Sequence, residues 1–599
     1  MRKIILTLLA LVSVCFVSEA KVIKITLADG TMRVFTSSQL SDISFNDDGT
    51  LSVTSYNGMP LMQNQPVLSV LSIDDEEVVY EQSDETLKLD LDVDGIPFNV
   101  AGERPVKRLK YVYPSMDPFG NPVTLSGCII IPDEIWDGEC KSEGILLYNH
   151  YTIFHRDEAP TAGYTTLESM FLANPLKLNY ILVESDFYGF GATVRFPQAF
   201  LQGTNNARAS LDGLLAAKRI LSDMGIDYGP LCFNLGYSSG GFDALATQKL
   251  RDMEYADLIS FDKTFAGGGP YDINECYRQY VIIDSTAYNA VPLLLMVSTN
   301  ETQQMGLEYT DVFQPEIASQ IDELINSKNY SSWPVCDIIG RDKKIHEILT
   351  SEYCDLKSPE SKEISSIFKE LSIATDWTPD PSQRIYIFHS RTDDYVPVQS
   401  ARGIIKYLQK NGFEPSIIPG KTNLQTNYVV TGMGHLSATL VYLIQTTSAL
   451  KAWPVMYTDG VLNPDYAELI NCDFDLIMAM RQLDALGFDC RGFIKAMITL
   501  MDSSVDVENI DKQTLKRLVI QACEQIGITL DDLKQMFLDS GIEYQPFVME
   551  LIAYLAEQPS VTEGADLQMA VDQIFNEMMN QSLTPADVYA NQLREWIGK

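Results

Sequence analysis

The chain has 599 residues, of which 46% are hydrophobic and 10% aromatic, which is enough apolar surface for large cores. Its 81 acidic residues outnumber its 44 basic residues and give a formal net charge of −37. A surface this acidic argues against nucleic-acid binding, which needs a basic stripe, and is typical of a protein that stays soluble outside the cytoplasm.

The N-terminus has the features of a secretory signal. A basic start, an apolar run over Ile4–Val17 and a small-x-small exit predict a signal peptide at residues 1–20, cleaved after Ala20. The apolar run is too short to span a bilayer, and we expect no transmembrane segment elsewhere. The protein is therefore expected to be secreted or periplasmic. Attachment to the cell surface through Cys15 is the alternative, which the large Val14 before it disfavours.

Residues 21–84 predict a small β module. Val22–Leu27 and Leu51–Thr54 are strand runs with turn residues beside them, and the apolar segment Val67–Ile73 completes the module. A catalytic domain is predicted to follow at residues 85–455.

The first chemical feature of that domain lies at the end of a strand. Gly144–Asn149 is an apolar strand run that ends at His150. Loops that leave the end of such a strand commonly carry binding groups, so this loop is a candidate to present an oxyanion donor. A strand-end histidine without a chemical role is the alternative.

The strongest chemical signal is Gly236–Gly241, which contains a G-x-S-x-G pattern centred on Ser238. The apolar strand run Pro230–Leu235 precedes it, and Gly241–Leu250 follows with apolar residues at helical spacing. Strand, glycine-rich turn and helix form the context of a nucleophile elbow, where glycines allow a sharp turn and a close approach to the hydroxyl. We therefore predict that Ser238 is a nucleophile. The alternative is a structural Gly-Ser turn in an unrelated α/β protein.

A nucleophilic serine needs a base, and after an elbow the acid and then the base follow along the chain. Arg384–Phe388 is an apolar strand run, and Asp393 and its competitor Asp394 come after its end. Asn427–Val430 begins a further run, after which His435 opens a helix. Each group thus follows its own strand, at the edge where parallel sheets place their sites. We predict Asp393 as the orienting acid and His435 as the general base.

Two helical regions complete the expected organisation. Residues 273–380 are predicted to form a helical cap, because this insertion leaves the sheet after Gly267–Gly269 and returns before the strand that leads to the acid. Its apolar run Val291–Val297 looks exposed and suits an acyl-chain wall. Residues 456–599 are acidic and predicted to be helical, with apolar stripes at helical spacing that are typical of a bundle core.

Several motifs between about residues 108 and 450 point to one family. They are a hairpin Y-x-S-x-D-x-x-G-x-P within Tyr111–Val123, a Y-x-H-G-T-like loop at Tyr148–Thr152, a D-Y-x-G-x-G-like turn at Asp186–Ala192, the glycine-rich strand end Phe265–Asp272, and an H-G-x-x-D-x-x-V-P-like segment at His389–Pro397. Together with the elbow they resemble the α/β-hydrolase superfamily, and above all the secretory lipases related to lipase A.

The resemblance implies an α/β class protein with the α/β-hydrolase fold, a mainly parallel sheet and a helical cap insertion. The small N-terminal β module and the C-terminal helical region are additions to it. The resemblance selects Asp393 over Asp394. It also implies one oxyanion amide from Ser239, directly after the nucleophile, and a second from Tyr151 or Thr152, since Tyr151 replaces the family's glycine.

No metal site and no cofactor are predicted. The chain has no C-x-x-C, H-E-x-x-H, Walker or dinucleotide-binding pattern. Asp90–Gly95 imitates the start of a calcium loop, but Ala101 stands where the bidentate Glu belongs, so we expect a strand with one wet face. Cys232 is expected to be a buried free thiol, and a bridge between Cys336 and Cys354 stays open.

We predict a secreted serine hydrolase that cleaves carboxylic esters, of carboxylesterase or lipase type, through a Ser-Asp-His triad and an acyl-enzyme. Its expected partner is a small-molecule ester or lipid, and the oligomeric state is left open. One alternative is a prolyl-oligopeptidase-type serine peptidase, although the region before the catalytic domain is too short for a propeller. The other is a non-catalytic surface binding protein on a hydrolase scaffold, which would be expected to have lost a triad member.

Overall fold

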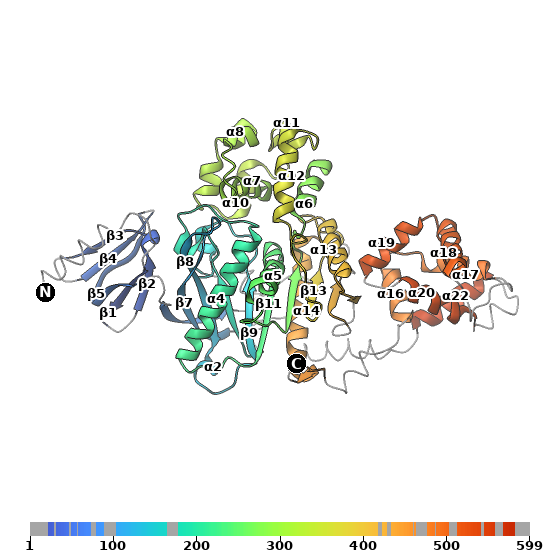
Figure 1. Cartoon of the computed structure of the whole chain (residues 1–599), viewed down its shortest axis with the longest axis horizontal. Helices are drawn as coiled ribbons and strands as arrows, with labels where there is room; N and C mark the ends of the chain where they lie inside the picture. Colours follow the sequence, from blue (N-terminus) through green and yellow to red (C-terminus); the bar gives the residue numbers. More distant parts are fainter. Residues whose placement is uncertain are drawn as a thin grey trace. The chain divides into compact units, whose positions relative to one another are not determined.

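The computed structural model divides the chain into two compact units, residues 1–380 with 394–404 and residues 381–393 with 405–599 (Figure 1). Each unit is considered by itself. The structure describes residues 22–28, 32–46, 50–56, 58–73, 79–88, 103–163, 178–416, 422–427, 433–458, 461–462, 476–485, 487–501, 512–540, 544–556 and 567–580. The predicted signal peptide and the predicted strand at Asp90–Gly95 lie outside these residues.

The first unit begins with a five-stranded antiparallel sheet in the order β2-β1-β5-β4-β3. Alternate side chains of its strands face one side, as the period of a strand requires, and there Ile25, Leu51 and Val53 are fully buried in a small core. The strands are β1 Val22–Leu27, β2 Met32–Thr36, β3 Leu40–Phe45, β4 Thr50–Ser55 and β5 Pro60–Ile73, with the short helix η1 Ser37–Gln39 between β2 and β3.

The sheet that carries the predicted elbow follows in the same unit. Its strands run in the order β12-β11-β9-β10-β8-β7-β6. The pairs β6–β7, β7–β8 and β8–β10 are antiparallel. The pairs β10–β9, β9–β11 and β11–β12 are parallel. β6 crosses the predicted boundary at residue 84. The bounds are β6 Val79–Lys88, β7 Glu103–Met116, β8 Pro122–Pro132, β9 Gly144–Asn149, β10 Tyr180–Ser185, β11 Leu231–Tyr237 and β12 Lys263–Gly267.

Helices cover this sheet and form a separate layer at one of its ends (Figure 1). α4 Gly203–Asp223 and α5 Ser239–Leu250 pack together beside the strands. The layer drawn at the top of Figure 1 comes from the predicted cap. Its longer members are α6 Ile273–Ile283, α7 Ala290–Thr302, α10 Ser332–Ile339 and α12 Pro359–Leu371, and shorter ones are α8 Tyr309–Val312, α9 Pro315–Ala318 and α11 Ser351–Cys354.

The run Val291–Val297 differs from its expectation, because it is buried rather than exposed. It lies on α7, where Leu293 and Leu294 are 0% and 1% exposed. A helix that is apolar on all sides is a core helix, so the absence of a polar face explains the burial.

In its described residues, the second unit contains three parallel strands, the short antiparallel pair β16 Tyr457–Thr458 and β17 Val461–Leu462, and the C-terminal helices. β15 lies between β13 and β14. α14 begins at His435, and the six helices described beyond it share one apolar core, as the stripes of the sequence predicted. The bounds are β13 Ile385–Phe388, β14 Pro415–Ser416, β15 Leu424–Asn427, α14 His435–Met456, α16 Leu476–Ala485, α17 Cys490–Leu500, α18 Lys512–Ile526, α19 Leu530–Ser540, α20 Tyr544–Ala556 and α22 Leu567–Asn580. α13 Val398–Lys410 spans the division between the units.

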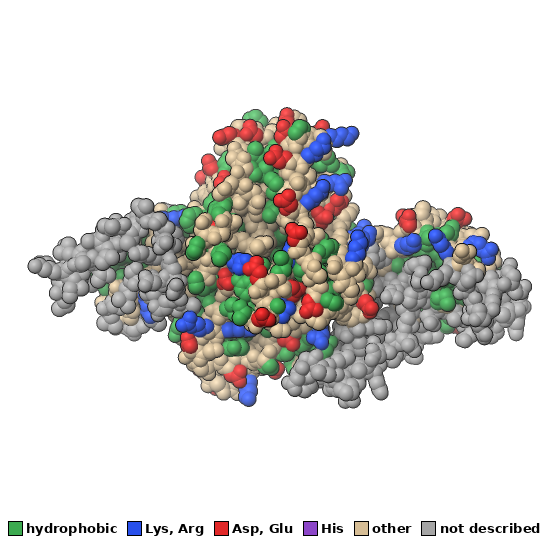
Figure 2. Space-filling model, viewed as in Figure 1, with side chains coloured by type: hydrophobic (Ala, Val, Ile, Leu, Met, Phe, Trp, Pro, Cys, Tyr) green, Lys and Arg blue, Asp and Glu red, His purple; other side chains and the backbone are tan. Residues whose placement is uncertain are grey.

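The described surface carries charges of both signs, and the cysteines considered in the sequence are free. On the face shown in Figure 2, acidic and basic side chains are scattered among other residues over the cap and the catalytic domain. None of the described helices has both the length and the apolar character needed to cross a membrane. Cys232, Cys336 and Cys354 are free thiols, so the open possibility of a Cys336–Cys354 bridge is not realised.

One buried acid on α5 makes stability depend on pH. Asp243 is 3% exposed and accepts a hydrogen bond from Asn206 Nδ2 on α4 at 3.0 Å. Burial raises the pKa of Asp243 to about 7, from a usual value near 3.8. The folded state then retains a proton that the unfolded chain releases, so stability falls as pH rises from about 4 to about 7 and stays at its lower level above that.

We expect Asp243→Asn to remove this loss while its amide oxygen still accepts from Asn206. Urea denaturation of the variant should therefore show a larger gain over the parent protein at pH 8 than at pH 5. An equal difference at both pH values would show that Asp243 is ionised in the folded protein throughout this range.

Candidate active site

The predicted nucleophile occupies a strained turn between β11 and α5. Ser238 has φ 60° and ψ −129°, a conformation that residues with a side chain rarely adopt. Its own N–H donates to Gly267 O at 2.9 Å. Its carbonyl oxygen accepts from Gly241 N and Phe242 N at 2.9 and 3.2 Å. These bonds hold the turn from both sides, so the strand, strained residue and helix expected of a nucleophile elbow are all present.

Two glycines allow this turn to lie against the neighbouring strand. A Cβ atom added at Gly240 would lie 2.1 Å from Asn149 O at the end of β9, and one added at Gly236 would lie 2.1 Å from Gly240 O. Real Cβ contacts are never this short, so both positions exclude any side chain. The glycines of the motif are therefore required by the approach of one backbone to another.

A buried network of side-chain amides lies beneath the elbow. Asn149 Nδ2 donates to Asn234 Oδ1 at 2.8 Å and to Leu235 O at 3.2 Å, and Asn149 Oδ1 accepts from Ser210 Oγ at 2.8 Å. Asn234 Nδ2 in turn donates to Ala244 O in α5 at 2.7 Å. The network joins β9, β11, α4 and α5, and satisfied polar networks of this kind specify one arrangement of the elements that they connect.

Three of the predicted site residues meet at one small cavity. Ser238, Ser239 and Thr152 line a space of about 30 Å³, and Thr152 Oγ1 donates to Ser239 Oγ at 3.0 Å. The rest of the lining is apolar or aromatic: Phe200, Leu201, Pro270, Ile273, Cys276, Tyr280, Tyr288, Val291, Leu295, Tyr395 and Val396.

Aromatic residues of the cavity wall were not identified from the sequence. Tyr288 and Tyr395 stack with ring centroids 4.8 Å apart, and Tyr280 OH donates to Tyr395 O at 2.6 Å. Tyr395 lies two residues after Asp393, which is the only feature of the sequence that could have pointed to it.

The predicted oxyanion residues occupy different environments. Ser239 is the first residue of α5, and the first amides of a helix have no acceptor within the helix, so its N–H is available to a ligand. Tyr151 packs beside a cluster that contains Ile153 and Phe190, while Thr152 lines the cavity.

His150, at the end of β9, contacts Tyr151 and Phe187. It donates through Nδ1 to Tyr151 O at 2.8 Å, and its ring lies 4.6 Å from that of Phe187. Burial lowers the pKa of His150, so the imidazole is neutral near pH 7.

The predicted acid and base meet within the second unit. His435 Nδ1 lies 2.7 Å from Asp393 Oδ2, and the two side chains are 3% and 0% exposed. Asp394, the competitor, is exposed. The loops that carry the pair are also joined, because Ser390 Oγ and Thr392 Oγ1 both donate to Met433 O, at 2.6 and 3.0 Å.

A second buried imidazole lies beside the same carboxylate. His389 Nε2 is 3.7 Å from Asp393 Oδ2, and the His389 side chain is fully buried. Among the described residues, no group of three or more His, Cys, Asp or Glu side chains is arranged to hold a metal ion.

Comparisons with known proteins agree with this chemistry. The model of a family described as secretory lipase matches residues 156–445. Over these residues the chain matches the secretory lipase family, as its motifs indicated. The protein is accordingly an enzyme that hydrolyses ester bonds. No curated protein sequence matches it.

Solved structures identify the fold of this part of the chain. A candidate hydrolase from Legionella pneumophila has a TM-score of 0.52 at 19% identity, covering 60% of this chain and 91% of its own. The ligand-bound rice cell wall degrading esterase LipA of Xanthomonas oryzae gives 0.49 at 19%, with 59% and 90% covered. Candida antarctica lipase A gives 0.45 at 15%, with 64% and 86% covered. The fold of the secretory lipase domain is the α/β-hydrolase fold, as predicted.

The close approach at the elbow gives a direct test. Gly240→Ala should destabilise the protein by about 1–3 kcal/mol, because the new methyl group meets the backbone of β9. Gly163→Ala is the matched control, since its nearest neighbour would be Asp157 O at 3.8 Å. Urea denaturation and the rate of Ser238 labelling by a small phosphonate measure the two variants. Equal effects of the two substitutions would show that β9 moves away easily.

Proposed function

We propose that this secretory lipase family member is an exported serine esterase in which Ser238, His435 and Asp393 act as nucleophile, general base and orienting acid. The observation that carries the proposal is the strained elbow, which presents Ser238 to a mainly apolar cavity. The 2.7 Å contact of His435 Nδ1 with Asp393 supports the other two roles, because it leaves Nε2 as the nitrogen that exchanges protons with the serine. Export through the signal peptide at residues 1–20 is consistent with the secretory family.

The proposed reaction proceeds in two halves. Ser238 Oγ attacks the ester carbonyl carbon while His435 takes its proton, and collapse of the tetrahedral intermediate expels the alcohol, which receives that proton. Water then attacks the acyl-enzyme with His435 again as base, and the acid product leaves. Asp393 holds the imidazole and stabilises its charged form.

Two backbone amides are proposed to bind the oxyanion. The amide of Ser239 is the first, because it opens α5 beside the nucleophile. Of the two candidates for the second, Thr152 is favoured over Tyr151, since Thr152 lines the cavity with Ser238. The hydrogen bond from Thr152 to Ser239 at 3.0 Å ties the two donors together.

The cavity also favours small acyl groups. Its volume of about 30 Å³ is far below the roughly 300–1,000 Å³ of pockets that hold larger ligands, so it suits a short acyl chain better than a long one. Val291 and Leu295 of α7 and the stacked pair Tyr288 and Tyr395 form the wall that limits it. We therefore propose short-chain esters as the preferred substrates.

The triad assignment predicts unequal losses. Ser238→Ala and His435→Ala should each lower kcat with p-nitrophenyl acetate by about 10⁶-fold, whereas Asp393→Asn should cost about 10⁴-fold. Asp394→Asn, one residue away and exposed, is the matched control and should stay near the parent rate. Near-normal activity of purified Ser238→Ala would contradict the nucleophile. Activity on proline peptides and not on esters would favour the peptidase alternative.

The acyl preference predicts a shift with one wall residue. Leu295→Ala should extend the range of p-nitrophenyl esters that are cleaved from acetate toward octanoate, because it removes side-chain volume from the wall. Leu294→Ala deletes the same atoms from the same helix outside the lining and serves as control. The ratio of kcat/KM for octanoate over acetate is the measurement. A ratio that rises equally in both variants would attribute the effect to a loosened α7 and refute the proposed wall.

A further inference from the structure

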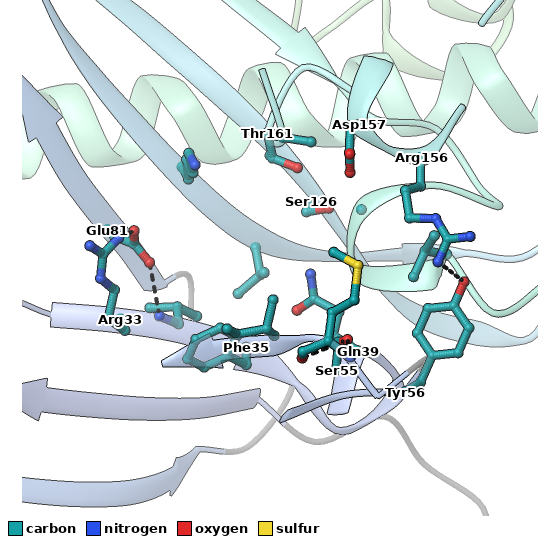
Figure 3. A pocket seen from close by; sticks show the side chains of 18 of the residues that line it. Arg33, Phe35, Gln39, Ser55, Tyr56, Glu81, Ser126, Arg156, Asp157 and Thr161 are labelled. Carbon is teal, nitrogen blue, oxygen red and sulfur yellow. Dashed lines mark hydrogen bonds and ion pairs between the residues drawn. The ribbon is translucent and has the colours of Figure 1, made fainter. Parts of the chain in front are cut away.

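A second and larger cavity lies between the N-terminal sheet and the catalytic sheet, both within the first unit. Its volume is about 390 Å³. Figure 3 shows Arg33 and Glu81 toward one end, Tyr56 and Arg156 toward the other, and Phe35 between them. It shares no lining residue with the cavity at Ser238.

Specific contacts hold the two walls of this cavity together. Thr36 Oγ1 donates to Ala192 O at 2.9 Å, and Arg195 Nη2 donates to Leu40 O at 2.7 Å. The ring of Tyr56 contacts two guanidinium groups, those of Arg195 and Arg156, at 5.4 and 5.8 Å from its centroid. The cavity is therefore bounded by a defined interface and is not a gap between loosely associated modules.

The cavity has more positive charge than its acids neutralise. Three cationic side chains line it, Arg33, Lys110 and Arg156, against Glu81 and Asp157. Arg33 is paired with Glu81. Asp157 is 66% exposed and lies 3.7 Å from His155.

Lys110 and Arg156 are the cations that no acid compensates. Lys110 stands opposite Glu81 in the β6–β7 register, yet it makes no hydrogen bond or ion pair with any residue that the structure describes. The hydrogen bonds of Arg156 go to neutral acceptors, including Ser327 O at 2.8 Å and Tyr56 OH at 3.4 Å. In a chain with a formal charge of −37, this local excess of positive charge selects for an anion.

Apolar side chains supply the rest of the wall. Phe35 and Met62 line the cavity together with Met59 and Leu61, which remain 51% and 43% exposed. Exposed apolar side chains beside uncompensated cations suit a ligand that has both an apolar part and a negative charge.

We propose that this cavity binds a small organic anion, with its carboxylate or phosphate group at Lys110 and its apolar part against Phe35, Met59 and Leu61. The site is independent of ester hydrolysis. It exists only while the N-terminal sheet is docked, so an occupant also stabilises that docking.

Calorimetric titration of the full chain carrying Ser238→Ala tests the proposal at low ionic strength. The probes are hexanoate, hexyl phosphate and the neutral hexanol. We expect one of the two anions to bind with one site per chain and hexanol at least tenfold more weakly. The tighter anion identifies the headgroup. Inorganic phosphate alone should bind more weakly than hexyl phosphate, because it lacks the apolar part.

Variants locate the site. Lys110→Gln should raise the Kd of the bound anion at least about tenfold, the usual effect of losing a hydrogen bond to a charged group. Lys141→Gln, an exposed lysine outside the cavity lining, should leave it unchanged. Leu61→Asp, at an exposed position, should weaken binding by repulsion without affecting the fold. No binding, equal binding of hexanol, or an unchanged Kd in Lys110→Gln would overturn the proposal.

Discussion

The contact between the elbow and the end of β9 is the constraint on which the catalytic domain depends. Gly240 lies so close to Asn149 O that no side chain fits there. Ser238 adopts a positive φ to make the turn. A strained residue persists only where its surroundings over-determine it. Here the hydrogen bonds on both sides of Ser238 and the amide network of Asn149 and Asn234 supply that support.

The same constraint organises the chemistry around it. Because α5 begins directly at the elbow, its first amide lies next to the nucleophile, and the loop after β9 brings Thr152 to the same cavity. Packing that first serves the fold thus also positions the groups that the proposed reaction needs. The polar atoms that remain are few, and the surrounding wall is apolar, which strengthens electrostatic interactions with a developing oxyanion.

The sequence predicted the local parts of this arrangement well, because each is encoded by consecutive residues. The elbow, the strand before it and the helix that opens at His435 follow from apolar runs and glycines. These patterns do not decide between Asp393 and Asp394, because the two are adjacent residues of the same type. Burial separates them in the structure, where Asp393 contacts His435 and Asp394 is exposed. The family resemblance selected the same residue from its motif.

Features formed by residues far apart in the chain could not be predicted from local sequence patterns. Val291–Val297 suggested an exposed wall, but a helix that is apolar on all sides is buried, and only Val291 and Leu295 of this run line the cavity. The stack of Tyr288 on Tyr395 and the cavity lined by Arg33 and Lys110 each join residues more than seventy positions apart.

The docking of the N-terminal sheet also bears on how the chain is made. Thr36 and its acceptor Ala192 are 156 positions apart, so the sheet emerges from the ribosome long before its partner surface exists. During that interval it must rely on its own small core of Ile25, Leu51 and Val53. Until it docks on the rest of the chain, such a sheet is exposed to proteases and can pair with strands of other chains. Three of the four strand pairings in this sheet join strands that are consecutive in the chain, and such local pairing favours early formation over pairing between distant segments.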